Sequence, residues 1–313
     1  MDTLVPILIV FILGAAIGSF LNVVVYRLPV GLSLIYPPSR CPRCETGLKP
    51  YDNVPVLGWL WLKGKCRSCR LPIAMRYPMV EFATGCLFVA VFLVFGTTWQ
   101  TLGHWIFVCW LLTLALIDLD TMTLPNVLTA SGLLLGWGFQ GWLSYLSQPS
   151  LSHVAGGVMS AMIVSMVGLW AFDLIGVMGS RAFGKPAMGG GDAKLAAMMA
   201  AWLGWQGLLL STFLAAAMGA VIGGTALALG ALGPKQHIPF GPYLALGALL
   251  AMFYGEQLIG AYLAIFFRWA YRLALLMRGL GFGWASAMWR VSLSDAVRGL
   301  QHRPIRILGQ IVQ

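Results

Sequence analysis

Two acidic motifs that lie far apart in the chain carry the residue types best suited to chemistry. A DLD motif beginning at Asp118 ends one apolar stretch, and a GGGD motif ending at Asp192 opens another. Carboxylates at the ends of membrane helices are costly and rare, so each one marks a possible functional site. Helix-breaking residues beside both motifs predict a shared polar cavity in which two acids could act together.

The chemistry available to such a pair is that of an aspartic protease. Two carboxylates a few ångströms apart share one proton over a broad pH range. One can then act as a base on water while its protonated partner polarises a scissile carbonyl. Asp118 and Asp120 are about 200° apart around a helix, so only one of them can face a given cavity. Ion-paired structural acids and the proton relay of a transporter are the alternatives.

The composition predicts the elements that must position these acids. Hydrophobic residues make up 59% of the chain and charged residues 10%, and the mean hydropathy is +0.83. A soluble core cannot absorb so much apolar sequence, which favours an all-α polytopic membrane protein. We expect about eight transmembrane helices, each near the roughly 20 residues that cross a bilayer. Their expected ranges are 4–26, 79–97, 102–118, 127–146, 153–177, 193–210, 211–231 and 241–265.

The net charge of +10 is concentrated in loops. Nine of the twenty Lys and Arg residues lie from Arg27 to Arg76, in the only long polar loop. Four more lie near two later loops, namely Arg181, Lys185, Lys194 and Lys235. The positive-inside rule places these loops in the cytoplasm, and the span count then puts both acidic motifs at the cytoplasmic ends of their helices. This distribution argues against nucleic acid as a partner.

Four cysteines in the polar loop have the spacing of a metal site. The pairs Cys41/Cys44 and Cys66/Cys69 are both CxxC motifs, with 21 residues between them. This spacing predicts a tetrahedral four-thiolate zinc site. Disulfides and a redox-active CxxC are the alternatives, disfavoured by a reducing compartment and by the lack of a strand–helix setting. Four protein thiolates leave no open position for water, so we expect the zinc to be structural.

Further motifs stand in a fixed order with these sites. They are the segment 18–29 (GSFLNVVVYRLP), the two CxxC pairs, 52–55 (DNVP), 76–78 (RYP) with Glu81, the two acidic motifs and 238–243 (IPFGPY). In this order they resemble the bacterial type IV prepilin peptidase family, also called leader peptidase/N-methyltransferases. The resemblance covers residues 14–262, roughly four-fifths of the chain.

The resemblance implies that Asp118 and Asp192 are the catalytic pair. It also implies cleavage of the short basic leader of type IV prepilins or pseudopilins, after a glycine and on the cytoplasmic side of the bacterial inner membrane. N-methylation of the new N-terminal residue, with S-adenosylmethionine as methyl donor, is the second implied activity. No residues are predicted for the donor site, because the chain has no glycine-rich nucleotide-binding motif. A peptidase without methyltransferase activity and a proton-coupled transporter are the alternative functions.

We expect four segments along the chain. They are a first transmembrane helix (1–26), a cytoplasmic zinc-binding loop domain associated with methyl transfer (27–78), a multi-helix transmembrane aspartic peptidase domain (79–265) and a basic extension (266–313). The extension is expected to be an amphipathic helix on the lipid surface. Arg272 and Arg278 would each cost about 2.5–3.5 kcal/mol at the centre of a ninth span. Contact with a second copy or with the pilus or secretion machinery is a possible role.

Overall fold

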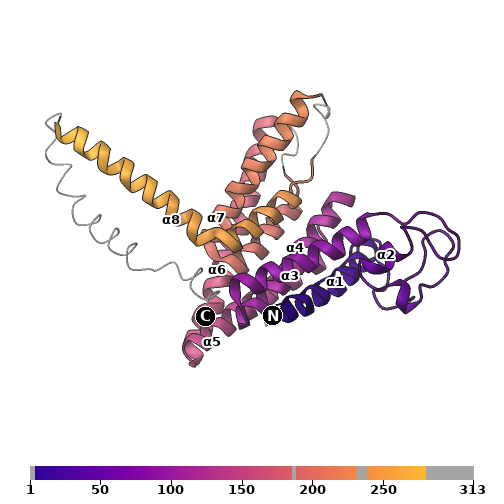
Figure 1. Cartoon of the computed structure of the whole chain (residues 1–313). Helices are drawn as coiled ribbons and strands as arrows, with labels where there is room; N and C mark the ends of the chain where they lie inside the picture. The colour runs from indigo at the N-terminus through magenta and orange to yellow at the C-terminus, as the bar shows by residue number, and fades with distance from the viewer. Residues whose placement is uncertain (1–3, 185–187, 231–237, 280–313) are drawn as a thin grey trace. The chain divides into compact units, whose positions relative to one another are not determined.

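The computed structural model describes residues 4–184, 188–230 and 238–279 (Figure 1). Its regular elements are the helices α1 (Leu4–Arg27), η1 (Pro50–Asp52), α2 (Leu57–Trp61), α3 (Arg76–Phe95), α4 (Trp99–Thr121), α5 (Asn126–Ser147), α6 (Leu151–Phe183), α7 (Gly190–Ala228) and α8 (Gly241–Gly279). The chain forms two compact units, Met1–Phe253 and Tyr254–Gln313, and α8 begins in the first and continues into the second.

The helices confirm the prediction of an all-α polytopic membrane protein. Among the described residues, six helices are long and apolar enough to cross a membrane, namely α1, α3, α4, α6, α7 and α8. Large apolar side chains stay exposed along them, for example Leu8 (58%) and Leu209 (61%). Exposed apolar surface of this extent is typical of helices that face lipid. Helix α5 matches the predicted range 127–146, and α7 covers the two ranges 193–210 and 211–231.

Helix α7 is broken at Gly204, where φ is 69° and ψ is −177°. Glycine adopts this conformation without the penalty that a side chain would bring. The break frees the carbonyl of Trp202 from its helical partner, and Gln140 Nε2 on α5 donates to that oxygen at 3.0 Å. Backbone polar groups inside a bilayer need such partners. The predicted boundary between residues 210 and 211 is therefore wrong by about two helical turns.

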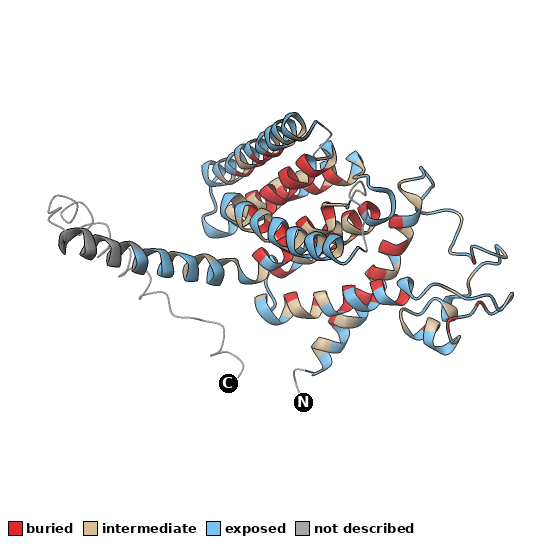
Figure 2. Ribbon diagram, turned by 90° about the horizontal axis from the view of Figure 1, so that it is seen from above, coloured by how far each residue is buried: buried red, intermediate tan, exposed pale blue. Residues whose placement is uncertain are grey.

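The core takes most of its buried residues from α4 and the first segment of α7. Figure 2 shows the buried residues on the faces where helices pack together. Leu111 and Leu114 of α4 and Met198 of α7 are completely buried. The same segment of α7 is rich in alanine, whose small side chain allows helices to approach closely in lipid. Trp202 stacks on Phe107 of α4, with ring centroids 5.3 Å apart. This packing holds the first segment of α7 against α4.

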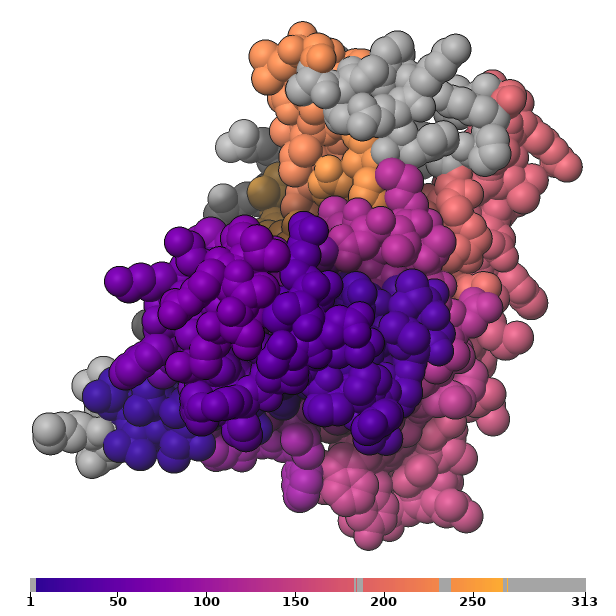
Figure 3. Space-filling model, turned by 90° about the vertical axis from the view of Figure 1, so that its right-hand side faces the viewer, coloured from indigo at the N-terminus to yellow at the C-terminus, as the bar shows by residue number. Residues whose placement is uncertain are grey.

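Four contacts show that several helix ends gather at one end of the bundle, which we call the site end. Asn22 near the end of α1 donates to the Tyr77 carbonyl near the start of α3 (3.1 Å). Arg76 of α3 contacts Asp120 of α4, and Lys194 of α7 contacts Asn126 of α5. Gly241 of α8 contacts Asp118 of α4. The segment between α1 and α3, in violet, forms a continuous surface beside this end (Figure 3).

The C-terminal extension is only partly described. Helix α8 continues without a break through Gly279, beyond the predicted boundary at residue 265. The rest of the predicted extension, residues 280–313, lies outside the described residues. Its amphipathic helix on the lipid surface, its contacts and the four-segment division of the chain stay predictions.

Candidate active site

Asp118 lies in the last turn of α4 and is 5% exposed. The backbone N–H of Gly241, the first residue of α8, donates to Asp118 Oδ2 at 2.9 Å. The carboxylate therefore meets the positive end of the α8 dipole. A Cβ atom at residue 241 would lie 2.6 Å from this oxygen, so the approach requires glycine. Gly241 belongs to the IPFGPY motif, whose sequence alone indicates no role for this glycine.

Asp192 lies in the first turn of α7 and is 8% exposed. Its backbone N–H donates to the carbonyl of Gly189 at 3.1 Å, which closes the turn that begins the helix. A Cβ atom at Gly189 would lie 3.8 Å from Asp192 Oδ2, so this glycine borders the carboxyl group. Like Asp118, Asp192 stands where a helix terminus presents positive partial charge.

The structure brings the two acidic motifs together at the site end. The carboxyl groups of Asp118 and Asp192 interact electrostatically. Gly191 packs on Leu124, and a Cβ atom at residue 191 would lie 3.0 Å from that side chain. Lys194 Nζ donates to Asn126 Oδ1 at 2.7 Å. The residues around one motif thus contact those that follow the other, while the catalytic roles of the two acids stay a prediction.

Asp120, the second acid of the DLD motif, faces a different neighbour. Its carboxylate forms an ion pair with Arg76 of α3, with Nη1 and Oδ1 2.6 Å apart. Both side chains are partly exposed, at 38% and 41%. The angular separation expected for residues two apart on a helix accounts for this split. Asp118 is therefore the acid of this motif that is directed toward Asp192.

The four loop cysteines form one cluster. The ligand sulfur atoms of Cys41, Cys44, Cys66 and Cys69 all lie within 4.8 Å of one another. Two of the Sγ–Sγ distances, Cys41–Cys69 and Cys44–Cys66, are 3.9 Å. A tetrahedral zinc ion with Zn–S bonds of about 2.3 Å requires sulfur atoms about 3.8 Å apart. The donor set and its spacing therefore fit zinc, and none of the four cysteines is in a disulfide.

The two CxxC turns have the same backbone design. The N–H groups of Glu45 and Arg70 donate to the carbonyls of Cys41 and Cys66, each at 3.0 Å. Both donors have a left-handed backbone, with φ of 55° and 61°. Hydrogen bonds with the side chain and backbone of Thr46 lower the pKa of Cys44 to about 6. A thiolate near neutral pH is the form that binds metal.

Two contacts tie the loop to the rest of the molecule. Arg67, between the second pair of cysteines, donates through Nε to Asp52 Oδ2 at 2.9 Å. Glu81 of α3 accepts the N–H of Val56 at 2.7 Å. Val56 has φ 60° and ψ −53°, and Leu57 N bonds to Pro55 O at 2.6 Å, which together form a strained γ-turn. The buried Glu81 therefore stabilises a backbone conformation that valine rarely adopts.

A cavity of about 360 Å³ lies between α1 and the loop. Its polar side chains are Ser19 and Arg27 of α1 with Ser39 and Asn53 of the loop, and Phe20 contributes an aromatic wall. Arg27 donates to the carbonyls of two loop residues, Ser33 (2.9 Å) and Pro37 (2.7 Å). These bonds hold the loop over α1 and give the cavity its shape.

The fold and these sites define a polytopic helical membrane protein with paired carboxylates and a four-thiolate cluster. Residues 12–95 match the family described as the bacterial peptidase A24 N-terminal domain. Residues 105–224 match the type IV leader peptidase family. The chain therefore belongs to the type IV leader peptidase family, which confirms the resemblance found in the sequence.

Similar proteins match this chain over most of its length. A prepilin leader peptidase/N-methyltransferase of Aeromonas hydrophila is 38% identical over 284 residues, which cover 82% of this chain and 94% of the relative. The protein of that name in Pseudomonas aeruginosa is 38% identical over 282 residues, covering 82% and 93%. The one in Myxococcus xanthus is 39% identical over 230 residues, covering 72% and 65%. No solved structure matches the chain.

Proposed function

We propose that this membrane peptidase removes the leader of type IV prepilins or pseudopilins with Asp118 and Asp192 as its catalytic acids, and then methylates the new N-terminus. The single observation that carries the peptidase proposal is the meeting of these two buried carboxylates, 74 residues apart in sequence, at one end of the bundle. The names of the relatives support leader cleavage and methylation as a class of activity.

The proposed hydrolysis uses one proton shared by the two acids. The ionised carboxylate takes a proton from water, and the water oxygen attacks the scissile carbonyl carbon. The protonated acid gives its proton to the carbonyl oxygen, which forms a tetrahedral diol. When the diol collapses, the C–N bond breaks and the leaving amine receives a proton from the acid that had accepted it. The other acid takes back a proton from a diol hydroxyl as the C=O bond re-forms. The same two acids then hold one proton again and can start another cycle.

We propose that the site end faces the cytoplasm of a bacterial inner membrane. The long loop from Arg27 to Arg76 carries nine of the twenty basic residues and joins α1 to α3 at this end. Positively charged loops remain on the cytoplasmic side during insertion. The apolar helix of a prepilin would lie among the spans, while its polar leader would reach the acids.

Zinc is the proposed occupant of the four-thiolate cluster. Cys41, Cys44, Cys66 and Cys69 would bind it, and their geometry matches the Zn–S distance. Metal binding could contribute about 10–16 kcal/mol to folding of the loop, which is too small for a core of its own. The proposed role of the metal is structural.

S-adenosylmethionine is the proposed methyl donor, and we propose the 360 Å³ cavity as its binding site. Ser19 and Asn53 offer hydrogen-bonding groups to a polar ligand, and Phe20 offers a surface on which a flat ring can stack. When bound, the donor supplies a methyl group to the new N-terminal amine. Direct binding of labelled donor to wild type and to an Asn53→Leu variant tests this placement independently of turnover.

The peptidase proposal is tested by replacing each acid with its uncharged isostere. Purified Asp118→Asn and Asp192→Asn proteins should retain their fold but leave a prepilin uncut, because one base and one acid are both needed. Asp120→Asn is the matched control in the same motif, and it should still cleave. Mass spectrometry of the products with and without S-adenosylmethionine reports leader loss and methylation separately.

The alternatives give different results in the same experiment. Cleavage by either catalytic-site variant at the wild-type rate would refute the two-acid mechanism. A peptidase without methyltransferase activity would yield a trimmed product whose mass does not change when the donor is added. A proton-coupled transporter would leave the prepilin intact and move protons in vesicles.

A further inference from the structure

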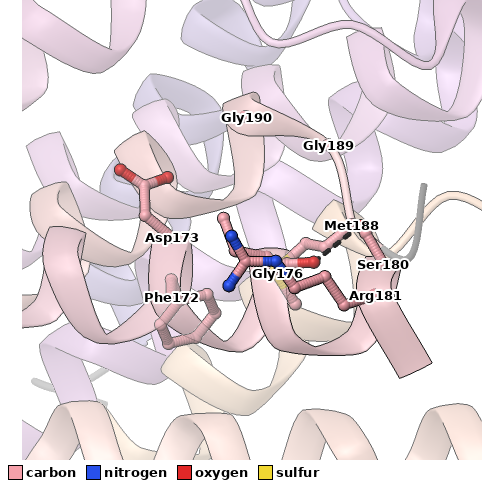
Figure 4. Close-up of a pocket in the computed structure, with 9 residues that line it drawn as sticks. Phe172, Asp173, Gly176, Ser180, Arg181, Met188, Gly189 and Gly190 are labelled. Carbon is pink, nitrogen blue, oxygen red and sulfur yellow. Dashed lines mark hydrogen bonds between the residues drawn. The ribbon is translucent and has the colours of Figure 1, made fainter.

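A second cavity, of about 410 Å³, lies beside the candidate active site, between the later part of α6 and the segment that begins α7 (Figure 4). Phe172, Asp173, Gly176 and Arg181 line it from α6, and Gly189 and Gly190 line it from the opposite side. Gly176 lies close to Met188, since a Cβ atom there would be 3.7 Å from that side chain. None of the activities described above uses the charged groups of this cavity.

Asp173 is the unusual member of the lining, because it is a charged residue within an apolar membrane helix. Its side chain is exposed, and no hydrogen bond or ion pair reaches its carboxylate from the described residues. An acid in such a helix is a functional-site candidate by default. The neighbouring Phe172 is buried at 4% exposure, so the backbone of this turn is fixed by packing.

By helix length, Asp173 and Asp118 lie at similar distances from the starts of their helices. Asp173 lies about 33 Å from the start of α6 at 1.5 Å per residue, and Asp118 lies about 29 Å from the start of α4. Both helices run toward the site end, and the hydrocarbon core of a bilayer is about 30 Å thick. Asp173 therefore lies at the membrane boundary, where its charge can meet a soluble, charged segment of substrate.

The cavity is also adjacent to Asp192. Gly189 lines the cavity, and a Cβ atom at this residue would lie 3.8 Å from Asp192 Oδ2. The three glycines that precede Asp192 leave this boundary free of side chains. A peptide whose scissile bond reaches Asp192 can thus extend its neighbouring residues into the cavity.

We propose that this cavity binds the leader of the substrate and that Asp173 pairs with a cationic side chain, Lys or Arg, of that leader. The proposal rests on the proposed prepilin cleavage and assigns a specificity-determining residue to it. The substrate is the occupant favoured here, because the cavity opens beside the acid that would cut it. Arg181 lies two turns further along α6 and contributes positive charge to the same wall. Its guanidinium can donate to peptide carbonyl oxygens but repels a leader cation.

A double-mutant cycle with the substrate tests this pairing. The cycle combines wild type and Asp173→Asn with a prepilin peptide whose leader carries Lys, and with one in which that Lys is Gln. We expect either single change to raise KM about fivefold, equivalent to about 1 kcal/mol for a partly solvated ion pair. Because Asp173 does not touch the reacting bond, kcat should stay at the wild-type value. The two changes together should raise KM no further than one alone.

A charge exchange and a control on the same wall complete the experiment. Asp173→Lys should favour a leader in which Glu replaces Lys, which reverses the preference of the wild type. Arg181→Gln should not raise KM for the cationic leader, since it removes a like charge. Additive effects in the cycle, no reversal by Asp173→Lys, or an equal rise in KM for Arg181→Gln would each overturn the proposal. Unchanged kcat in these variants would leave the roles of Asp118 and Asp192 intact.

Discussion

Replacing Gly241 by alanine should impair the peptidase without unfolding it. The N–H of Gly241 holds Asp118 Oδ2 at 2.9 Å, and an added Cβ atom would lie 2.6 Å from the same oxygen. Ordinary contact begins near 3.4 Å, so the carboxylate and the start of α8 must separate by about 0.8 Å. Misplacement of a catalytic group by about 1 Å can cost about 10²-fold in rate, and we expect kcat to fall roughly 30- to 100-fold.

The assay is steady-state cleavage of a prepilin peptide by purified protein in detergent, with kcat and KM determined separately. Gly260→Ala is the matched control, because this glycine lies in the same helix and has no heavy atom within 4 Å of an added Cβ. Thermal unfolding and zinc content of both variants should resemble those of the wild type. A folded Gly241→Ala protein that cleaves at the wild-type kcat would refute the idea that α8 positions Asp118.

Two further predictions concern the loop. The Arg67 guanidinium lowers the pKa of Asp52 below its usual value in the folded protein. The ion pair therefore stabilises the protein fully above about pH 4, which is the pKa of Asp52 in the unfolded chain. This stabilisation is lost as the pH falls through the lower pKa of the folded state. The difference in melting temperature between wild type and Arg67→Gln should therefore be full at pH 7 and vanish at strongly acid pH; a difference that persists there would contradict this account. Thr46→Val should raise the pH at which zinc is released, because Thr46 lowers the pKa of Cys44 to about 6 and protons compete with the metal for the thiolate. A chelating dye reports this release, and identical release curves would show that Thr46 does not tune the site.

The four-cysteine cluster was predictable because its geometry is local. Each CxxC turn is closed by bonds between residues only four apart, so spacing in the sequence largely determines where the sulfur atoms lie. The loop's link to α3 was not predictable in this way. Glu81 belongs to a quoted motif, but its bond to Val56 spans 25 residues and depends on a γ-turn that nothing in the local sequence indicates.

The acidic site shows the same division between local and distant information. The predicted helix ends placed Asp118 and Asp192 at one end of the bundle. The two-residue spacing of Asp118 and Asp120 explains why Asp120 faces Arg76 instead. The bond from Gly241 joins residues 123 apart, and hydropathy carries no information about such a contact. The predicted boundary between residues 210 and 211 missed the break in α7 for a related reason. Glycines are frequent in membrane helices, and the residues around Gly204 do not mark it as the site of a break.

The bond from Gln140 to the broken turn of α7 has a consequence for any effort to stabilise this protein. Leucine at residue 140 would raise the hydropathy of α5 on every scale, since it replaces an amide with an alkyl group. It would also leave the Trp202 oxygen without its donor in a region that excludes water. The more apolar variant should therefore be the less stable protein. Gln140, the polar residue that a designer would remove first, is the one that allows α7 to be interrupted within the bilayer.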